Sequence, residues 1–335
     1  MKWAHETKAT GIQYIGEMCR YLVASPPTQY DRAHNIRFAF GNGMRPDVWQ
    51  EFKDRFNVGT IAEFYGATEG SGACYIHSRN AFLRGAVGKQ GLIIRNLLNT
   101  FLIVQHDHST DEPYRDPQSG LCVKCKTNEP GELLHPLDPN DIEAKYLGYF
   151  NNDKATMSKV LRNVLKKGDA YYRTGDLQKR DEEGRLWFVD RVGDTFRWKS
   201  ENVSTAEVSQ AIGSHPKITE ANVYGVQIPG FDGRAGCAAL VLTDGQTFDS
   251  NLSKELALHA SKQLPLYAVP LFLRIMKRVE VTGTLKHQKV ALRNEGVDPA
   301  NFAEDELYWL ERGAERYNKL DQHDWKRIMN GNAKL

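Results

Sequence analysis

Apolar positions in the first third of the chain change their spacing several times, and each change marks a predicted element. Between residues 10 and 24 the apolar side chains stand at positions 12, 15, 18, 22 and 23, a helical spacing that ends at Ser25-Pro26-Pro27. Ile36–Phe40 predicts a short strand, Pro46–Phe56 a helix, and Thr60–Tyr65 a second strand that ends in a glycine turn. Strands that alternate with helices and end in glycine turns predict an α/β layer fold with ligands at the strand ends.

The pattern changes again in the second half of the chain. Residues 105–140 are rich in Asp, Pro and Gly and predict short strands and loops, and Leu186–Val189 predicts a strand before a charged turn. The capping box Ser204-Thr-Ala-Glu207 then opens a helix, and Asn251–Gln263 predicts another. Further strands are predicted over residues 221–228, 237–242 and 271–275. We therefore predict a mixed α/β chain of two domains, 1–192 and 193–335, the second a compact α+β unit.

The composition of the chain excludes several classes of protein but does not indicate a particular reaction. The 335 residues are 41% hydrophobic and 26% charged, as in ordinary soluble globular proteins. Lys and Arg number 44 against 42 Asp and Glu, which is too balanced for a nucleic-acid binder. No apolar run approaches membrane-spanning length and the N-terminus lacks signal-peptide features, so we expect the chain to stay on the reducing side. Among five cysteines, Cys122 and Cys125 favour a plain loop pair over a metal or redox site.

Two segments could contact a nucleotide. In Tyr65-Gly-Ala-Thr-Glu69, the Thr68 hydroxyl and backbone N–H groups can face a phosphate while Glu69 holds Mg²⁺. The alternative is an ordinary strand and turn with an exposed glutamate. In Tyr172-Arg-Thr-Gly-Asp176, Asp176 can accept both hydroxyl groups of a ribose. The alternative there is an aspartate that caps its own turn.

Two further segments lie at or beyond the predicted domain boundary. Residues 190–204 interleave charged side chains with Phe196 and Trp198, and Gly193-Asp194 suits a hinge, although a charged turn is usually just solvated. In Thr282-Gly-Thr-Leu-Lys286, the lysine can swing towards a site and neutralise a phosphate, although a lysine in a basic segment is usually a surface residue.

The order of these segments, with Leu264-Pro-Leu-Tyr-Ala-Val-Pro270 between the last two, resembles the later motifs of the adenylate-forming superfamily. Residues 188–207, FVDRVGDTFRWKSENVSTAE, resemble the signature of the fatty acid transport proteins, the very-long-chain acyl-CoA synthetases, and most of all a fungal-type member. Similarity runs from near Ile12 to near Pro299. The resemblance covers only the C-terminal half of such proteins. It implies the C-terminal portion of the large AMP-binding domain, without its N-terminal part, followed by a small mobile C-terminal domain with a terminal extension.

The resemblance also implies a reaction and roles for individual residues. Long- or very-long-chain fatty acids would be activated with ATP to acyl-CoA through an acyl-adenylate, in connection with fatty acid uptake. Thr68 would contact the phosphate, Glu69 would bind Mg²⁺, and Lys286 would be the adenylation lysine. The other implied roles are the adenine contacts Gly41, Gly43, Met44 and Tyr65, a further nucleotide contact at Gly66, the ribose contacts Asp176 and Arg191, and the hinge Gly193-Asp194.

Two departures from the family pattern limit what this chain is expected to do. The Ser/Thr/Gly-rich loop that grips the phosphates of ATP is absent, as is most of the acyl tunnel, so chain-length preference is not encoded here. Ser200 stands where the family usually has glycine. We therefore expect weak or no adenylation by this chain alone. The alternative is a non-catalytic remnant that binds AMP or CoA, or docks to a lipid-transport complex. A peptide-synthetase adenylation domain is disfavoured by the 188–207 signature.

The last three residues, Ala333-Lys334-Leu335, resemble the Ser-Lys-Leu peroxisomal address. They predict a peroxisomal location and an import receptor as partner. Peripheral association with the plasma membrane, the endoplasmic reticulum or lipid droplets is the alternative.

Overall fold

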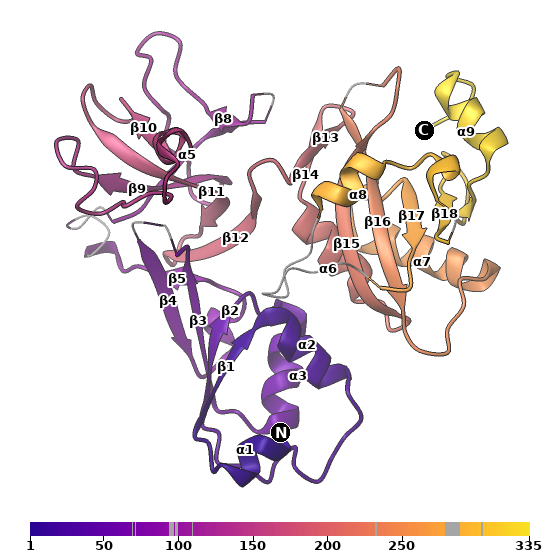
Figure 1. Cartoon of the computed structure of the whole chain (residues 1–335), viewed down its shortest axis with the longest axis horizontal. Helices are drawn as coiled ribbons and strands as arrows, with labels where there is room; N and C mark the ends of the chain where they lie inside the picture. Colours follow the sequence, from indigo (N-terminus) through magenta and orange to yellow (C-terminus); the bar gives the residue numbers. More distant parts are fainter. Residues whose placement is uncertain are drawn as a thin grey trace. The chain divides into compact units, whose positions relative to one another are not determined.

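The computed structural model divides the chain into two compact units, Met1–Val192 and Gly193–Leu335, and we describe each by itself (Figure 1). The structure describes residues 1–68, 70, 72–93, 97, 100–108, 110–231, 233–278, 289–302 and 304–335. Within these residues, none of the helices has the length and apolar character needed to cross a bilayer.

The first unit begins with a four-stranded sheet in the order β1-β2-β3-β4. The strands β1 (Gly11–Ile15), β2 (Phe38–Asn42) and β3 (Thr60–Gly66) are parallel, and β4 (Ala73–Ser78) returns antiparallel to β3. The connecting helices are α2 (Gly16–Ala24) and α3 (Pro46–Phe56), and a short helix α1 (Lys2–Glu6) precedes the sheet. Trp49, Phe52 and Phe56 of α3 pack with Ala39 and Ile61 to form the core on one face.

The opposite face of this sheet carries exposed aromatic side chains. Phe38 and Phe40 are each 41% exposed and Tyr75 is 76% exposed. Phe40 stacks on Phe64 with ring centroids 5.0 Å apart. Because parallel strands are normally covered on both faces, this surface is unusual for a folded α/β layer. We call Phe38, Phe40, Phe64 and Tyr75 the aromatic face.

The predicted helix over residues 10–24 is wrong in its first third, because Gly11–Ile15 is strand β1. Tyr14 is buried and β1 pairs in parallel with β2, a contact that spacing along the chain cannot reveal. The chain changes from strand to helix at Gly16, where a Cβ atom would lie 1.6 Å from the carbonyl oxygen of Gly43. By contrast, the predicted helix Pro46–Phe56 is confirmed to the residue.

The second sheet of this unit has the strand order β5-β12-β11-β9-β6, with β10 added beside β11. Its strands are β5 (Gly88–Lys89), β6 (Leu102–Val104), β9 (Gly131–Leu137), β10 (Val160–Arg162), β11 (Ala170–Arg180) and β12 (Arg185–Arg191). A small hairpin of β7 (His106–Asp107) and β8 (Glu112–Pro113), a 3-10 turn at Ala81–Leu83 and helix α5 (Asp153–Ser158) complete the unit. Residues 105–140 thus form short strands and loops, as predicted.

The second unit opens with a hairpin of β13 (Phe196–Trp198) and β14 (Glu201–Val203). A five-stranded sheet follows in the order β15-β16-β17-β18-β19. Its strands are β15 (Ile218–Gln227), β16 (Arg234–Leu242), β17 (Phe272–Ile275), β18 (Glu306–Trp309) and β19 (Asn318–Lys319). The helices of the unit are α6 (Thr205–Gly213), α7 (Ser250–Gln263), α8 (Val290–Glu295) and α9 (Gln322–Met329).

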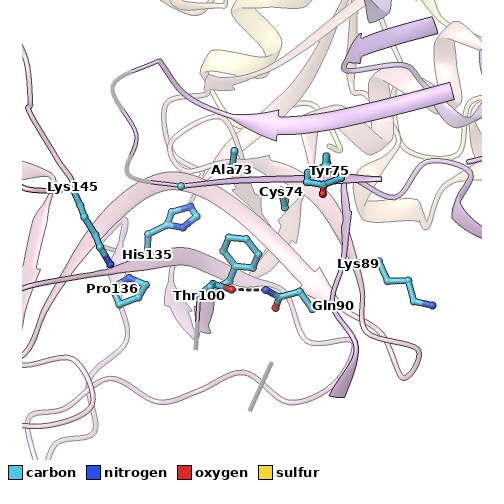
Figure 2. A pocket seen from close by; sticks show the side chains of 11 residues that line it. Ala73, Cys74, Tyr75, Lys89, Gln90, Thr100, His135, Pro136 and Lys145 are labelled. Carbon is cyan, nitrogen blue, oxygen red and sulfur yellow. Dashed lines mark hydrogen bonds between the residues drawn. The ribbon is translucent and has the colours of Figure 1, made fainter. Parts of the chain in front are cut away.

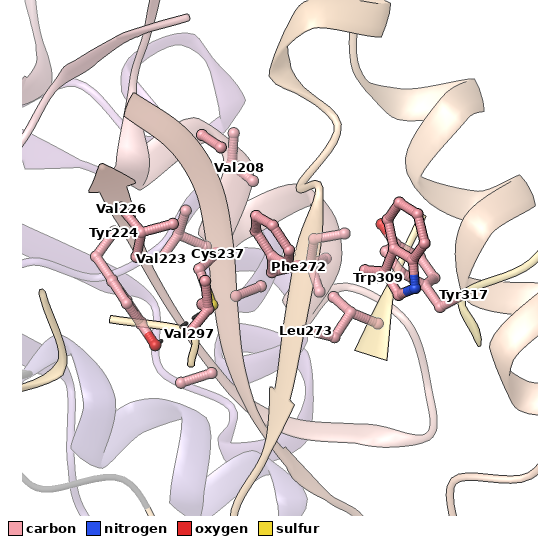
Figure 3. Close-up of a cluster of buried hydrophobic side chains, with 14 of the residues drawn as sticks. Val208, Val223, Tyr224, Val226, Cys237, Phe272, Leu273, Val297, Trp309 and Tyr317 are labelled. Carbon is pink, nitrogen blue, oxygen red and sulfur yellow. Dashed lines mark hydrogen bonds between the residues drawn. The ribbon is translucent and has the colours of Figure 1, made fainter. Parts of the chain in front are cut away.

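Local sequence signals and tertiary packing agree in this second unit. Ser204 caps α6 by accepting a hydrogen bond from the Glu207 N–H at 3.2 Å, as the capping box predicts. Figure 3 shows the buried side chains, among them Val223 on β15 and Phe272 on β17, gathered into one cluster. Leu307 and Trp309 of β18 and Ile328 of α9 extend this core beyond the elements that the sequence pattern predicted.

Candidate functional site

Three of the predicted nucleotide contacts come together in the first unit. The Tyr65 hydroxyl donates a hydrogen bond to Asp176 Oδ2 at 2.5 Å. Arg191 Nε lies 3.9 Å from Asp176 Oδ1, and the two residues are register partners on β11 and β12. Tyr65 belongs to the first sheet and Asp176 to the second, so their hydrogen bond joins the two sheets at a strand end.

The backbone around Asp176 is shaped by its own sequence, Thr-Gly-Asp. Gly175 has φ +75, which glycine adopts without strain, and its carbonyl accepts a hydrogen bond from the Val192 N–H at 2.8 Å. Thr174 Oγ1 donates to the Leu133 carbonyl at 2.7 Å and accepts from the Asp176 N–H at 3.1 Å. The pairing of β11 with β9 shifts register between Arg173 and Leu177, which turns this short stretch out of the regular ladder.

The electrostatic setting keeps Tyr65 protonated. Burial, and then the negative charge of Asp176, raise the pKa of the Tyr65 hydroxyl far above its ordinary value. It therefore remains a neutral donor that fixes one carboxylate oxygen of Asp176. A partly buried carboxylate held in this way is suited to accept hydrogen bonds from vicinal hydroxyl groups such as those of a ribose.

Gly41 lies near the end of β2, and Gly43 and Met44 follow in the turn after it. A Cβ atom on Gly41 would lie 2.1 Å from the carbonyl oxygen of Tyr14, so only glycine fits there without a shift. Gly43 has φ +77, and the Met44 N–H donates to Glu63 Oε1 at 3.1 Å. Because β2 and β3 are parallel, this turn lies at the same edge of the sheet as the end of β3.

Sequence reasoning missed Glu63, a buried acidic residue that is hydrogen-bonded to the turn after β2. Its side chain is buried in the middle of β3, where it accepts hydrogen bonds from the Tyr14 hydroxyl and from Met44 N–H. Burial raises the pKa of Glu63 to about 7, against the opposing effect of these hydrogen bonds. A lone acidic residue at an inward position of an apolar strand was the available signal, and its partners could not be read from the sequence.

The structure describes only part of the predicted phosphate and metal site. Thr68 and Gly66 are exposed at the end of β3, and the turn closes through a hydrogen bond from the Gly70 N–H to the Ala67 carbonyl at 3.0 Å. Glu69, the predicted Mg²⁺ ligand, and Lys286, the predicted adenylation lysine, both lie outside the described residues. Their roles stay predictions.

The predicted hinge residues both belong to the second unit. Gly193 has φ +82, and a Cβ atom there would meet no neighbour within 4 Å. Asp194 forms ion pairs with Lys289 at 3.3 Å and Arg293 at 3.2 Å, which lie at the start of α8 and within it. These ion pairs hold Asp194 against α8 of the second unit, which we also call the small domain, one residue after the predicted hinge glycine.

A cavity of about 620 Å³ lies beside β4 in the first unit (Figure 2). His135 on β9 and Ala73 on β4 both line it, as do the side chains of Gln90 and Thr100, which are joined by a 2.5 Å hydrogen bond. Burial lowers the pKa of His135 to about 4, so this imidazole is neutral at physiological pH. None of these residues was singled out in the sequence. Tyr65 and Asp176 are not among those that line the cavity.

The family model described as "AMP-binding enzyme C-terminal domain" matches residues 207–286. The chain is 44% identical to the very long-chain fatty acid transport protein of Cochliobolus heterostrophus, over 98% of this chain and 51% of that protein. It is 42% identical to isopenicillin N epimerase component 1 of Hapsidospora chrysogena, over 96% of this chain and 54% of that protein. It is 40% identical to human long-chain fatty acid transport protein 3, over 98% of this chain and 46% of that protein. The chain therefore spans about half the length of the curated relatives that it matches.

Solved structures show the same fold. ATP-bound MatB from Rhodopseudomonas palustris matches with a TM-score of 0.67 and 20% identity, over 88% of this chain and 52% of that one. A benzoate CoA ligase from Burkholderia xenovorans matches with a TM-score of 0.66 and 20% identity, over 87% of this chain and 52% of that one. These matches confirm the predicted mixed α/β fold class.

Proposed function

Since the chain belongs to the fatty acid transport protein family and has the fold of adenylate-forming enzymes, we propose that it carries the ribose, hinge and lysine half of a fatty acid–CoA ligase site. The substrates would be a long- or very-long-chain fatty acid, ATP and CoA. The observation that carries the proposal is the hydrogen bond from Tyr65 to Asp176, which joins two sheets at a strand end, with Arg191 in an ion pair with the same carboxylate at 3.9 Å.

The proposed reaction has two steps. The fatty acid carboxylate attacks the α-phosphate of ATP, so that an acyl–phosphate bond forms and pyrophosphate leaves. The CoA thiolate then attacks the acyl carbon and AMP leaves. Asp176, oriented by Tyr65 and Arg191, would hold the ribose through both steps, and Thr68 would contact the phosphate. Lys286 would neutralise charge on the phosphate as pyrophosphate departs.

Mg²⁺ is the cofactor that this chemistry implies, and when bound it would neutralise charge on the phosphates. Its predicted ligand, Glu69, lies outside the described residues, and the part of the chain that the structure describes contains no cluster of three metal-binding side chains. We therefore derive no step through the metal.

AMP binding tests the ribose contact directly. Replacing Asp176 by Asn should weaken AMP binding about 10- to 100-fold in isothermal titration calorimetry, because hydrogen bonds to a charged acceptor contribute about 1.5–3 kcal/mol. Asp153→Asn, an exposed substitution on α5 of the same unit, is the matched control and should leave the affinity unchanged. Equal AMP affinity in the wild type and in D176N would remove Asp176 from the site.

Turnover tests the second part of the proposal. We expect the purified chain to bind AMP but to release little or no pyrophosphate from ATP and a long-chain fatty acid, because it lacks the phosphate-gripping loop. A full-length relative serves as the positive control. Robust pyrophosphate release would contradict the expected weakness.

We also propose a peroxisomal location, supported by the terminal Ala333-Lys334-Leu335 sequence. Peripheral association with the plasma membrane, the endoplasmic reticulum or lipid droplets is the alternative. Fluorescence microscopy of the chain with and without its last three residues separates the two.

A further inference from the structure

The terminal tripeptide that resembles a peroxisomal address is packed into the small domain. Ala333 is 7% exposed and Leu335 is 8% exposed, and both belong to the hydrophobic cluster that includes Phe272 and Trp309. Lys334, between them, is exposed. The alternation of buried and exposed residues is that of an extended segment lying on an apolar surface.

Polar contacts hold the same segment in place. Lys199 Nζ donates a hydrogen bond to the main-chain oxygen of Leu335 at 2.6 Å. The Arg312 N–H donates to the Lys334 carbonyl at 3.0 Å, and the Asn332 N–H donates to the Arg327 carbonyl at 2.8 Å. Three contacts therefore fix the backbone of Asn332, Lys334 and Leu335 beyond α9.

Lys199 comes from a distant part of the chain. It lies in the loop of the β13–β14 hairpin, 136 residues before Leu335. Burial, and then the nearby positive charge of Arg312, lower the pKa of Lys199. Both effects disfavour the charged ammonium group, and the hydrogen bond that it donates to the main-chain oxygen of Leu335 offsets part of that cost.

A receptor that recognises a C-terminal tripeptide has to enclose its side chains and its terminal carboxylate. In the small domain these same groups face Lys199 and the hydrophobic cluster, so one tripeptide cannot occupy both places at once. We propose that Ala333-Lys334-Leu335 is a latch that docks in cis on the small domain, and that an import receptor binds it only after these contacts have been released.

Competition of this kind has a measurable consequence. The apparent affinity of the receptor for the chain equals its affinity for the free tail multiplied by the fraction of molecules in which the tail is undocked. Burial of a leucine side chain together with a charged hydrogen bond predicts a fall of about 10- to 100-fold relative to a free peptide. This inference rests on the peroxisomal address proposed above.

The test compares the binding of a purified C-terminal-tripeptide import receptor with three ligands, by fluorescence anisotropy or biolayer interferometry. These are a synthetic peptide of residues 326–335, the full chain, and the full chain with Lys199→Ala. We expect the peptide to bind at least about 10-fold more tightly than the full chain, and K199A to recover most of that difference. Lys254→Ala, which removes an exposed ion pair with Glu315 on the same domain, is the matched control and should behave as the wild type.

Carboxypeptidase digestion gives a readout that needs no receptor. The wild-type tail should be trimmed more slowly than the tail of K199A, while circular dichroism reports whether the variant is folded. Equal affinity of the peptide and the full chain, or equal trimming of wild type and folded K199A, would overturn the latch. Failure of the peptide itself to bind would overturn the address on which the latch rests.

Discussion

Replacing Ser200 by glycine should raise the stability of the small domain. The β13–β14 hairpin pairs Trp198 with Glu201, so its loop has only two residues, Lys199 and Ser200. Both have positive φ, 50 for Lys199 and 70 for Ser200, as a type I′ turn requires. Glycine is the preferred second residue of such a turn.

The magnitude follows from two opposing effects. A non-glycine residue in the left-handed region is strained by about 1–2 kcal/mol, which S200G removes. Glycine loses more conformational freedom on folding, which offsets about 0.5–1 kcal/mol of that gain. The net expectation is a stabilisation of about 0.5–1 kcal/mol, or about 2–4 °C in the Tm of the small domain.

Differential scanning calorimetry of the full chain measures this shift, and Ser200→Ala provides the control. Alanine also lacks the hydroxyl group but keeps the Cβ atom, so the strain remains and its Tm should stay near the wild-type value. If the Tm of S200G is equal to or lower than the Tm of S200A, backbone strain at this turn is not what limits stability. A firmer hairpin should also hold Lys199 against Leu335 and slow carboxypeptidase trimming of the tail.

Three further predictions concern the first unit. Because the folded-state pKa of Glu63 is raised to about 7 from 4.5, its contribution to stability is most favourable at low pH and is lost as pH rises from about 4.5 to about 7. In urea unfolding, the free energy of unfolding of E63Q relative to that of the wild type should therefore rise by up to about 3 kcal/mol between pH 4.5 and pH 7. A difference between the two proteins that does not change with pH would contradict this. Gly41→Ala should lower the free energy of unfolding by about 2 kcal/mol, because its new Cβ atom would clash with the Tyr14 carbonyl. The control is Gly59→Ala, whose new Cβ atom would be 3.7 Å from its nearest neighbour and whose free energy of unfolding should stay within about 1 kcal/mol of the wild-type value. Similar losses in both variants would refute the close-contact argument. Replacing Phe38 and Phe40 together by Thr should reduce the binding of a hydrophobic fluorescent dye, and it should reduce self-association measured by sedimentation velocity. Unchanged self-association would show that the aromatic face does not mediate it.

The sequence was informative where structure depends on neighbours along the chain. The helix Pro46–Phe56 has a proline near its start and an apolar stripe, and the cap at Ser204 joins residues only three positions apart. The sequence also singled out Ser200 as a departure from the family pattern, and the structure gives this residue a positive φ. Strand β1 was missed because a five-residue strand leading directly into a helix shows little period of its own.

Contacts between distant residues were decided only by the tertiary structure. The sequence marked Tyr65 and Asp176 as separate motifs, but their hydrogen bond spans 111 positions and depends on how two sheets meet. Glu63 looked like an ordinary strand residue until the fold buried it beside Tyr14.

The end of the chain illustrates the same division. The letters Ala-Lys-Leu determine what a receptor could recognise, because recognition of a short peptide depends on its own side chains. Whether those side chains are accessible depends on burial and on a lysine 136 residues away, which no local pattern encodes. The sequence thus determined the fold class, the family and the motifs, and the tertiary structure decided which of these groups meet and which are covered.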